Sequence, residues 1–289
     1  MQKRIVTIQD ISCFGKCSLT VALPLISAMG VETAVIPTAV LSTHTGGFTG
    51  YTFRDLTADI PQISAHWQNL KLHFDGIYTG YLGSRQQVQM VADFFDAFSD
   101  AKTQVIVDPV MGDRGRLYAG FTPDFAGEMR TLCQKADVIV PNMTEACLLL
   151  DMPYLSTYTE TDVKEILRRL TDIGCSTAIL TGVQYGDGRH GAVAYHCESD
   201  QFCSAFRQHI PEQMHGTGDI FSSILSGALV QSAPLEKAVE VAVNFTADSI
   251  EATIDDLYTL PKEQAPWYGV AFESCIGNLV AYTKQFINL

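Results

Sequence analysis

A glycine-rich turn in the last third of the chain, Gly216-Thr217-Gly218-Asp219, places a carboxylate where a helix is expected to begin. Apolar residues recur at helical spacing directly after it, over residues 220–229. Two glycines let backbone N–H groups converge on one point, and a helix start adds unpaired donors and the positive end of a dipole. Such a site suits the charge that develops on a phosphoryl group in transfer, and Asp219 beside it could take the proton of a hydroxyl. The alternative interpretation is that Asp219 is only a helix N-cap and that the glycines only form a turn.

Acidic and amide side chains follow two apolar Val-Ile-Val segments. Asp108 and Asp113 come after the first of these segments, and Asn142 and Glu145 come after the second. Oxygen ligands of this kind suit Mg²⁺, which proteins hold through few carboxylates, waters and substrate phosphates. The alternatives are that Asp113 is a turn residue and that Glu145 is a first-turn helix carboxylate. Together with the Gly-Thr-Gly-Asp turn, these residues indicate a site for phosphate and metal.

Short apolar segments alternate with longer amphipathic segments along the chain, which is typical of an α/β fold with a mostly parallel sheet and helices on both faces. In such a sheet the chemistry collects at the carboxyl ends of the strands, where these polar residues would lie. No Pro-rich or Ser-rich linker divides the chain, which favours a single domain over residues 1–289. We expect strands at residues 5–9, 33–41, 77–79, 104–107, 138–140 and 178–180, and helices at 19–29, 86–98, 124–134, 162–173, 219–230, 235–252 and 273–286.

The chain as a whole is acidic and has a high apolar content. Its 289 residues are 47% apolar, enough for a large core, and 32 Asp and Glu against 19 Lys and Arg give a formal charge of −13. This charge argues against general affinity for nucleic acid or for an anionic membrane surface. The eight cysteines lack the CxxC spacing of a zinc site, and no segment has the apolar length of a signal peptide or a membrane span. We therefore expect a cytoplasmic protein with reduced cysteines.

These motifs resemble those of the ribokinase-like superfamily, and nearly the whole chain resembles its pyridoxal/pyridoxamine (vitamin B6) kinases. The resemblance implies a ribokinase-like α/β fold with a flap over the active site, formed here by residues 113–118. It implies that the Gly-Thr-Gly-Asp turn supplies an anion hole and that Asp219 is the catalytic base. It also implies ATP-binding roles for Asp108, Asp113, Asn142, Glu145 and Thr181, with Mg²⁺ held near Asp113 and Glu145 through water.

Further segments resemble the vitamin pocket of these kinases. The Ser-Thr-His-Thr-Gly motif around His44 and Thr45 is similar to the segment that encloses the pyridine ring. Thr-Gly-Tyr, ending at Tyr81, matches a second pocket segment, and Tyr118 matches a tyrosine of the flap. From the residues alone, His44 could instead be a hydrogen-bonded core histidine, and Tyr81 could simply pack.

One position departs from the pattern of the vitamin B6 kinases. These enzymes usually have serine after the glutamine of the first strand, whereas this chain has Asp10 after Gln9, and the next loop lacks the common Gly-Asn pattern. A carboxylate near the pyridine substituents could favour the cationic aminomethyl group of pyridoxamine. Asp10 is therefore a candidate substrate-binding residue that affects the preference among the three vitamers.

The resemblance implies ATP-dependent phosphorylation of the 5′-hydroxyl of pyridoxal, pyridoxine or pyridoxamine. Mg²⁺ would be the cofactor, a monovalent cation is a further candidate, and the family is typically homodimeric. Hydroxymethylpyrimidine kinase is the closest rival, because it shares the fold and acts on a similar flat ring. A catalytically silent nucleotide- or vitamin-binding sensor is the rival from another class, although the presence of Asp219 argues against it.

Overall fold

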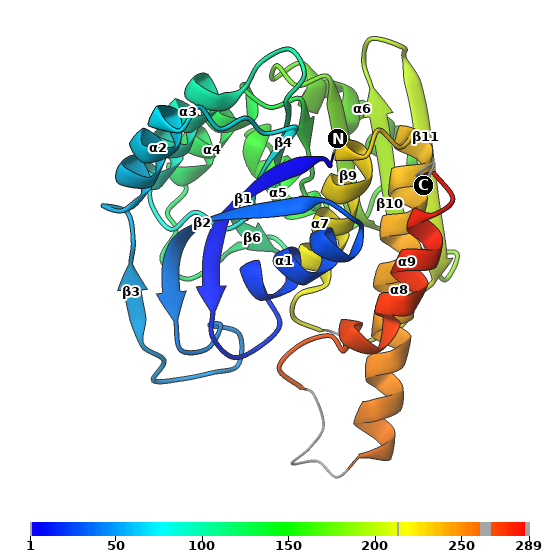
Figure 1. The fold of residues 1–289 in the computed structure, drawn as a ribbon. Helices are drawn as coiled ribbons and strands as arrows, with labels where there is room; N and C mark the ends of the chain where they lie inside the picture. Colours follow the sequence, from blue (N-terminus) through cyan, green and yellow to red (C-terminus); the bar gives the residue numbers. More distant parts are fainter. Residues whose placement is uncertain (1, 213, 261–266, 287–289) are drawn as a thin grey trace.

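The computed structural model describes residues 2–212, 214–260 and 267–286, and within them nine strands form one mixed sheet (Figure 1). The order is β11-β10-β9-β8-β5-β4-β1-β2-β3. The six strands from β9 to β2 in this order are parallel, whereas β10, β11 and β3 are antiparallel additions at the two sides. The strands are β1 Arg4–Ser12, β2 Glu32–Leu41, β3 Phe53–Asp55, β4 Gly76–Thr79, β5 Gln104–Val107, β8 Val138–Ile139, β9 Thr177–Val183, β10 Arg189–His196 and β11 Gln201–Gln208.

Both faces of the parallel strands are buried, because the period of two along a strand sends successive side chains to opposite faces. In β5, Val105 and Val107 join one core and Ile106 joins the other. In β9, Leu180 and Ile179 divide between the two cores in the same way. A parallel sheet of this kind needs helices on both sides, and the chain supplies them.

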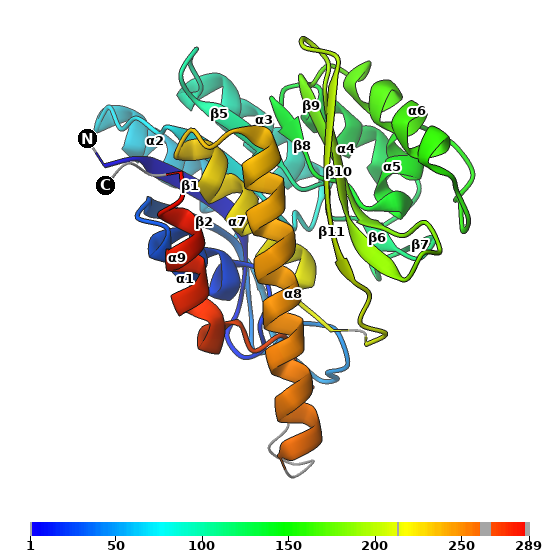
Figure 2. The ribbon, with the colours of Figure 1, turned by 90° about the vertical axis from the view of Figure 1, so that its right-hand side faces the viewer.

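Helices α2 to α6 cover one face of the sheet, and α1, α7, α8 and α9 cover the other (Figures 1 and 2). No helix within the described part of the chain is long and apolar enough to cross a membrane. The helices are α1 Leu19–Ala28, α2 Ile60–Asn69, α3 Arg85–Phe98, α4 Phe125–Cys133, α5 Met143–Leu149, α6 Glu160–Thr171, α7 Thr217–Val230, α8 Leu235–Thr259 and α9 Ile276–Thr283, with a 3₁₀ turn at Phe272–Cys275.

The predicted fold class is confirmed: the sheet is mostly parallel and helices flank it on both faces. Several smaller elements were not predicted. In the hairpin β10–β11, no residue of β11 is fully buried, so β11 lacks the apolar run of the central strands, and β10 has only a short one at residues 192–195. Helix α2 buries only Ile60 and therefore has a weak apolar stripe. The other unpredicted elements are α5, β3 and the separate two-stranded pair β6 Gly112–Asp113 and β7 Arg116–Leu117.

Two predicted helix boundaries were wrong. Helix α8 continues beyond residue 252 to Thr259, and its end projects past the rest of the molecule (Figure 2). The next residue, Leu260, has an extended backbone, which is the conformation that a proline at position 261 favours in the residue before it. The region 273–286 divides into the 3₁₀ turn and α9, rather than forming one helix.

Candidate active site

The Gly-Thr-Gly-Asp turn forms the start of α7. Gly216 is the residue before the helix and has a φ of +87°, in the left-handed region that favours glycine. A Cβ at this position would also lie 2.0 Å from the carbonyl oxygen of Lys16, so only glycine allows this approach. The first bond of the helix runs from Ile220 N to Gly216 O at 2.9 Å, which leaves the amides before Ile220 without a helical acceptor. The space beside Gly218 is open, since a Cβ at this position would have no atom within 4 Å.

Asp219 lies in the first turn of α7 and does not cap it, so the N-cap alternative is wrong. The cap position belongs to Gly216, which has no side-chain cap bond. The Asp219 carboxylate instead accepts a hydrogen bond from the backbone of Ser18. Burial raises its pKa to about 7, the Asp10 charge adds to the rise, and the Ser18 bond opposes it. A carboxylate with this pKa can accept a proton near neutral pH.

Asp108 is buried beside the same helix. Its Oδ2 accepts a hydrogen bond from Ser222 Oγ at 2.7 Å. Burial raises the pKa of Asp108 to about 7, the Asp219 charge adds to the rise, and Ser222 opposes it. Ser222 was not predicted as a site residue, although its spacing of three from Asp219 places it on the same side of the helix.

Glu145 is a buried first-turn carboxylate of α5. Its Oε2 accepts from Asn142 N at 2.9 Å, which completes a capping box, and its Oε1 accepts from Met111 N at 3.0 Å. Burial, followed by the charge of Asp108, holds the pKa of Glu145 well above its usual range. The first-turn alternative therefore describes its local role, while the Met111 bond and the effect of Asp108 place Glu145 in the site.

Asn142 and Thr181 lie side by side at the ends of neighbouring strands. Asn142 caps α5 with its Oδ1, and its Nδ2 donates to Gly112 O at 2.9 Å. Thr181 N donates to Pro141 O at 3.0 Å, which forms a single parallel bridge between Thr181 and Asn142. These contacts hold the segment after β8 against the end of β9.

The strands β6 and β7 form the hairpin at the position of the expected flap. Asp113 is exposed on it and accepts a hydrogen bond from Arg114 N at 2.8 Å. Partial burial raises the pKa of Tyr118 above its usual range, and the charges of Glu145, Asp113, Asp108 and Asp219 raise it further, in that order. The Tyr118 phenol thus lies within electrostatic reach of all four carboxylates.

No group of three or more His, Cys, Asp or Glu side chains in the described residues is preformed to hold a metal ion. The site nevertheless offers hard oxygen donors, and Mg²⁺ commonly binds through one or two carboxylates, water and substrate phosphates. Asp113, which is exposed, and Glu145, which is buried, fit such a weak and water-assisted site better than a closed one.

Asp10 is buried at an irregularity in the pairing of β1 with β2. Ser18 Oγ donates to its Oδ1 at 2.6 Å, and Ser12 Oγ donates to its Oδ2 at 3.1 Å. Burial raises the pKa of Asp10, while the two serines oppose that rise. Ser12 and Ser18 were not predicted as site residues, because nothing in their spacing identifies them as partners of Asp10.

Two of the three aromatic residues predicted for the substrate pocket, His44 and Tyr81, lie near Asp10, and the third, Tyr118, lies on the β6–β7 hairpin side. The charge of Asp10 acts on Tyr81, whose pKa is raised mainly by burial, and the His44 ring lies within electrostatic reach of Asp10. The Tyr81 ring packs against Phe121 with centroids 5.6 Å apart. The neighbouring Thr45 is exposed.

His44 is buried and has both ring nitrogens in hydrogen bonds. Its Nδ1 accepts from Gly46 N at 3.1 Å, which assigns the proton to Nε2, and Nε2 donates to Tyr268 O at 2.7 Å. The core-histidine alternative therefore describes its hydrogen bonding. His44 could still offer its ring to a ligand, and His215 lies 5.0 Å away between ring centroids.

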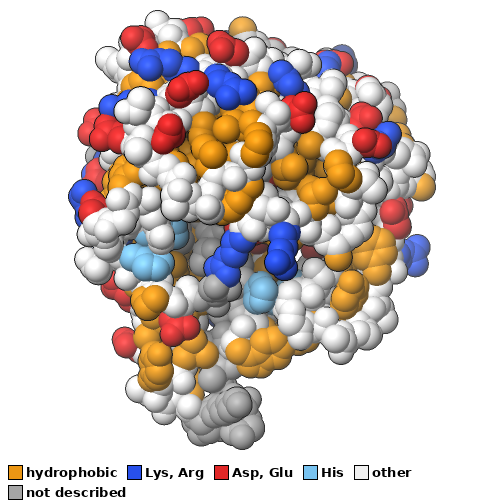
Figure 3. Space-filling model, turned by 180° about the vertical axis from the view of Figure 1, so that it is seen from behind, with side chains coloured by type: hydrophobic (Ala, Val, Ile, Leu, Met, Phe, Trp, Pro, Cys, Tyr) orange, Lys and Arg blue, Asp and Glu red, His pale blue; other side chains and the backbone are white. Residues whose placement is uncertain are grey.

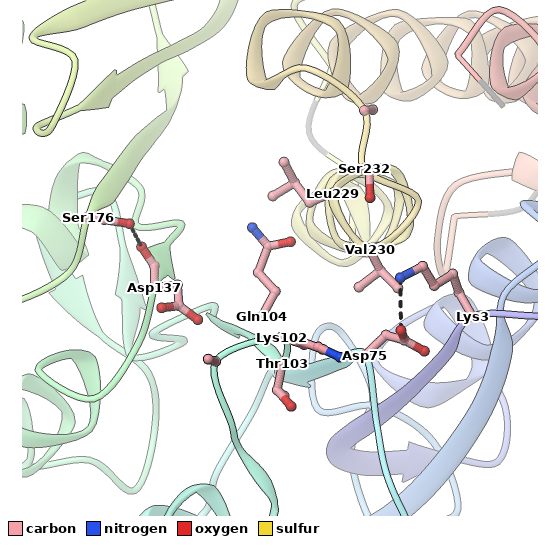
Figure 4. A pocket seen from close by; sticks show the side chains of 12 residues that line it. Lys3, Asp75, Lys102, Thr103, Gln104, Asp137, Ser176, Leu229, Val230 and Ser232 are labelled. Carbon is pink, nitrogen blue, oxygen red and sulfur yellow. Dashed lines mark hydrogen bonds and ion pairs between the residues drawn. The ribbon is translucent and has the colours of Figure 1, made fainter. Parts of the chain in front are cut away.

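A cavity of about 460 Å³ lies at the opposite end of the sheet, far from this chemistry (Figure 4). It opens at the amino-terminal ends of the parallel strands, and its lining includes Lys3, Asp75, Gln104 and Asp137. Lys3 Nζ and Asp75 Oδ1 form an ion pair at 2.9 Å within it. The candidate active site is instead the group of carboxylates at the carboxyl ends.

Comparison with known proteins places this site in a family context. A match to the family described as phosphomethylpyrimidine kinase spans residues 22–260. A structure of a candidate phosphomethylpyrimidine kinase from Bacteroides thetaiotaomicron with pyridoxal is 40% identical, covers 96% of both chains and has a TM-score of 0.89. Pyridoxal kinase from Lactobacillus plantarum is 32% identical, covers 99% of both chains and has a TM-score of 0.88. Pyridoxine/pyridoxal/pyridoxamine kinase of Bordetella avium is 28% identical over 267 residues, with 86% of this chain and 85% of the relative covered.

The raised pKa of Asp219 predicts a pH-dependent cost in stability. Its folded pKa, about 7, exceeds the unfolded value, so the folded chain holds the extra proton between about pH 4 and 7 and loses stability as the pH rises through that window. Asp219→Asn removes this charge, whose environment in the folded chain is unfavourable. The Tm of the variant relative to the wild type should therefore be higher at pH 8 than at pH 5.

Asp113→Asn is the matched control for this measurement. It removes an exposed carboxylate of the same site, which water solvates in the folded and unfolded chain alike. Its Tm relative to the wild type should be the same at both pH values. Equal behaviour of the two variants would show that Asp219 is not held in an unfavourable environment for its charge.

Proposed function

Since the chain belongs to the phosphomethylpyrimidine kinase family, we propose that it transfers the γ-phosphoryl group of ATP to the 5′-hydroxyl of a vitamin B6 vitamer: pyridoxal, pyridoxine or pyridoxamine. The observation that carries the proposal is Asp219, a carboxylate with a pKa of about 7 beside the amides that begin α7. The chain as a whole also supports the proposal. It is 40% identical to the Bacteroides thetaiotaomicron protein whose structure is described with pyridoxal, over 96% of both chains.

The chain's own residues suffice to position the reactants and move the proton. Asp219 would accept the proton of the 5′-hydroxyl as its oxygen attacks the γ-phosphorus, and the first-turn amides of α7 would stabilise the shifting charge. Asn142, Thr181 and Asp108 would bound the nucleotide side, and Asp10, His44, Thr45 and Tyr81 the vitamin side. Bound Mg²⁺ near Asp113 and Glu145 would neutralise phosphate charge, and the hairpin with Tyr118 would exclude water.

Hydroxymethylpyrimidine kinase is the second candidate function, because the matching family is described as phosphomethylpyrimidine kinase and a relative from Bacillus subtilis, 26% identical over 255 residues, is a hydroxymethylpyrimidine/phosphomethylpyrimidine kinase. Its substrate is also a flat heterocycle with a hydroxymethyl group, so the phosphoryl-transfer residues cannot distinguish the two. The residues of the vitamin side are expected to distinguish the two substrates, because Asp10 and Tyr81 lie together at the carboxyl ends of β1 and β4. A carboxylate beside a phenol suits the polar substituents of the pyridine ring.

We also propose that the protein is a homodimer, as the resemblance to vitamin B6 kinases implies, and that it is cytoplasmic. The exposed edge strand β3 supports an assembly of this kind, because all three of its side chains, including Phe53, are exposed. An unpaired edge with an exposed aromatic residue is a surface that proteins usually cover.

The first prediction from this function concerns the substrate. With MgATP, the purified protein should phosphorylate at least one B6 vitamer with a kcat/KM at least about tenfold above that for hydroxymethylpyrimidine, because a site that hydrogen-bonds the ring hydroxyl of the vitamers rejects a ring without this hydroxyl. ADP release with each of the four substrates measures this. A preference for hydroxymethylpyrimidine would establish the second candidate, and no turnover with any of them would leave a binding protein.

Asp10→Ser is the matched variant for the same assay. If the Asp10 carboxylate binds the cationic aminomethyl group of pyridoxamine, the ratio of kcat/KM for pyridoxamine to that for pyridoxal should fall in the variant. An unchanged ratio would limit Asp10 to its contacts with Ser12 and Ser18.

Asp219→Asn tests the role of the base. The amide oxygen can still accept the Ser18 hydrogen bond, but the amide group cannot take the hydroxyl proton. We expect kcat to fall roughly 10²–10⁴-fold, while the dissociation constants of ATP and vitamer change little. In the wild type, kcat should fall as the pH falls through about 7, because the base must be deprotonated to act. A variant with near-normal kcat would remove Asp219 from the mechanism.

Glu145→Gln tests the metal site. The substitution removes the charge that Mg²⁺ would sense, so the Mg²⁺ concentration for half-maximal rate should rise while the vitamer dissociation constant stays the same. The two oxygens of Glu145 accept hydrogen bonds from Met111 N and Asn142 N, whereas a glutamine side chain has only one oxygen and can replace only one of them. The Tm should therefore also fall, and the titration is run well below the Tm. An unchanged magnesium titration would leave Glu145 as a cap of α5 alone.

A further inference from the structure

The turn between β6 and β7 has an unusual residue for its shape. Arg114 and Gly115 connect the two strands, and their φ angles are +52° and +75°. Two successive positive φ angles are typical of a type I′ turn, where Asn-Gly is the favoured pair. Arginine is strained in this left-handed region, because its Cβ crowds the backbone. Strain at one residue of a site is an indication that its side chain has a task there.

Hydrogen bonds hold this turn against the nucleotide side of the candidate site. Gly115 N donates to Thr144 Oγ1 at 2.8 Å, in the first turn of α5. At the other end of β6, Gly112 O accepts from Asn142 Nδ2. These two bonds, made by the glycines on either side of Asp113 and Arg114, hold the turn close to Asn142 and the first turn of α5, and the Arg114 side chain is exposed.

The Arg114 guanidinium is available for another partner. Its Nε lies 3.6 Å from Asp113 Oδ2, and the two side chains are 58% and 53% exposed, so this pair is loose and weak. Lys16, whose backbone contacts Gly216, is in contrast held by Glu273 at 2.6 Å. Lys and Arg side chains border a hollow near the centre of the face shown in Figure 3.

The site has an excess of negative charge, which a cationic side chain such as that of Arg114 would offset. Tyr118, at the end of this hairpin, senses four carboxylates, and a triphosphate would bring further negative charge to them. Amides at the start of α7 carry only partial charges. A planar guanidinium donates two parallel hydrogen bonds to phosphate oxygens in a fixed geometry, which a single backbone amide or an ammonium group does not offer.

We propose that Arg114 is a phosphate-binding residue of the kinase: when MgATP binds, its guanidinium leaves Asp113 and donates hydrogen bonds to oxygens of the β- and γ-phosphoryl groups. The exchange frees the Asp113 carboxylate for the water shell of Mg²⁺. This inference rests on the proposed phosphoryl transfer, but it concerns binding of the triphosphate, which is measurable without turnover.

Arg114→Asn separates this role from a structural one. Asparagine is the better residue for the turn, so the Tm of the variant should equal or exceed that of the wild type. The lost contacts should nevertheless weaken MgATP binding and lower kcat/KM for ATP, each about 10- to 100-fold, the range for hydrogen bonds between charged groups. The dissociation constant of AMP, which lacks both phosphoryl groups, should change less than about twofold. Arg114→Lys should restore part of the ATP affinity.

Arg116→Asn is the matched control, because it removes the same charge from the neighbouring strand position opposite Asp113. It should leave ATP and AMP affinity unchanged. Equal losses in Arg114→Asn and Arg116→Asn would overturn the proposal in favour of a general charge effect, and unchanged ATP affinity in Arg114→Asn would overturn it outright. A wild type that binds ATP through Arg114 and phosphorylates no vitamer would contradict the proposed substrate and support this inference.

Discussion

The mutual proximity of two carboxylates, Asp108 and Asp219, is the constraint on which the rest of the site depends. Burial raises the pKa of both, the charge of Asp219 raises the pKa of Asp108 further, and the charge of Asp10 raises that of Asp219. None of the ion pairs among the described residues includes either of them. Such an arrangement is unfavourable for stability, since a charge without a cation or water is costly. It is favourable for chemistry, because it keeps a proton acceptor near neutral pH beside a group of unpaired amides. The surrounding hydrogen bonds from Ser18 and Ser222 make the arrangement tolerable.

The loop between β1 and α1 connects the two halves of the site. Ser18 donates its hydroxyl to Asp10 and its backbone N–H to Asp219, and it does so with a φ of +53°. The carbonyl oxygen of Lys16, in the same loop, lies close to Gly216. The vitamin side and the phosphoryl-transfer side are therefore fixed to one another through this loop. A change at Ser18 would alter both the charge environment of Asp10 and the position of the base.

The nucleotide side depends on helix capping in a similar way. Asn142 and Glu145 satisfy the first amides of α5 and, with the same side chains, hold the β6–β7 hairpin through Gly112 and Met111. Their local and functional roles are thus not alternatives. A capping box that also anchors a hairpin gives the flap a fixed base, while Asp113, Arg114 and Tyr118 remain exposed at its surface.

The sequence by itself determined the fold class and the motifs of the site. Apolar segments alternating with amphipathic ones require a parallel sheet with two covered faces, and such a sheet brings Asp108, Asn142 and Asp219 to one end. What only the tertiary structure decided is how these groups interact. Contacts between distant residues, such as Ser18 with Asp10 and Asp219 or Ser222 with Asp108, leave no period in the sequence. The raised pKa values and the strain at Arg114 follow from burial and backbone geometry, which exist only once the chain has folded.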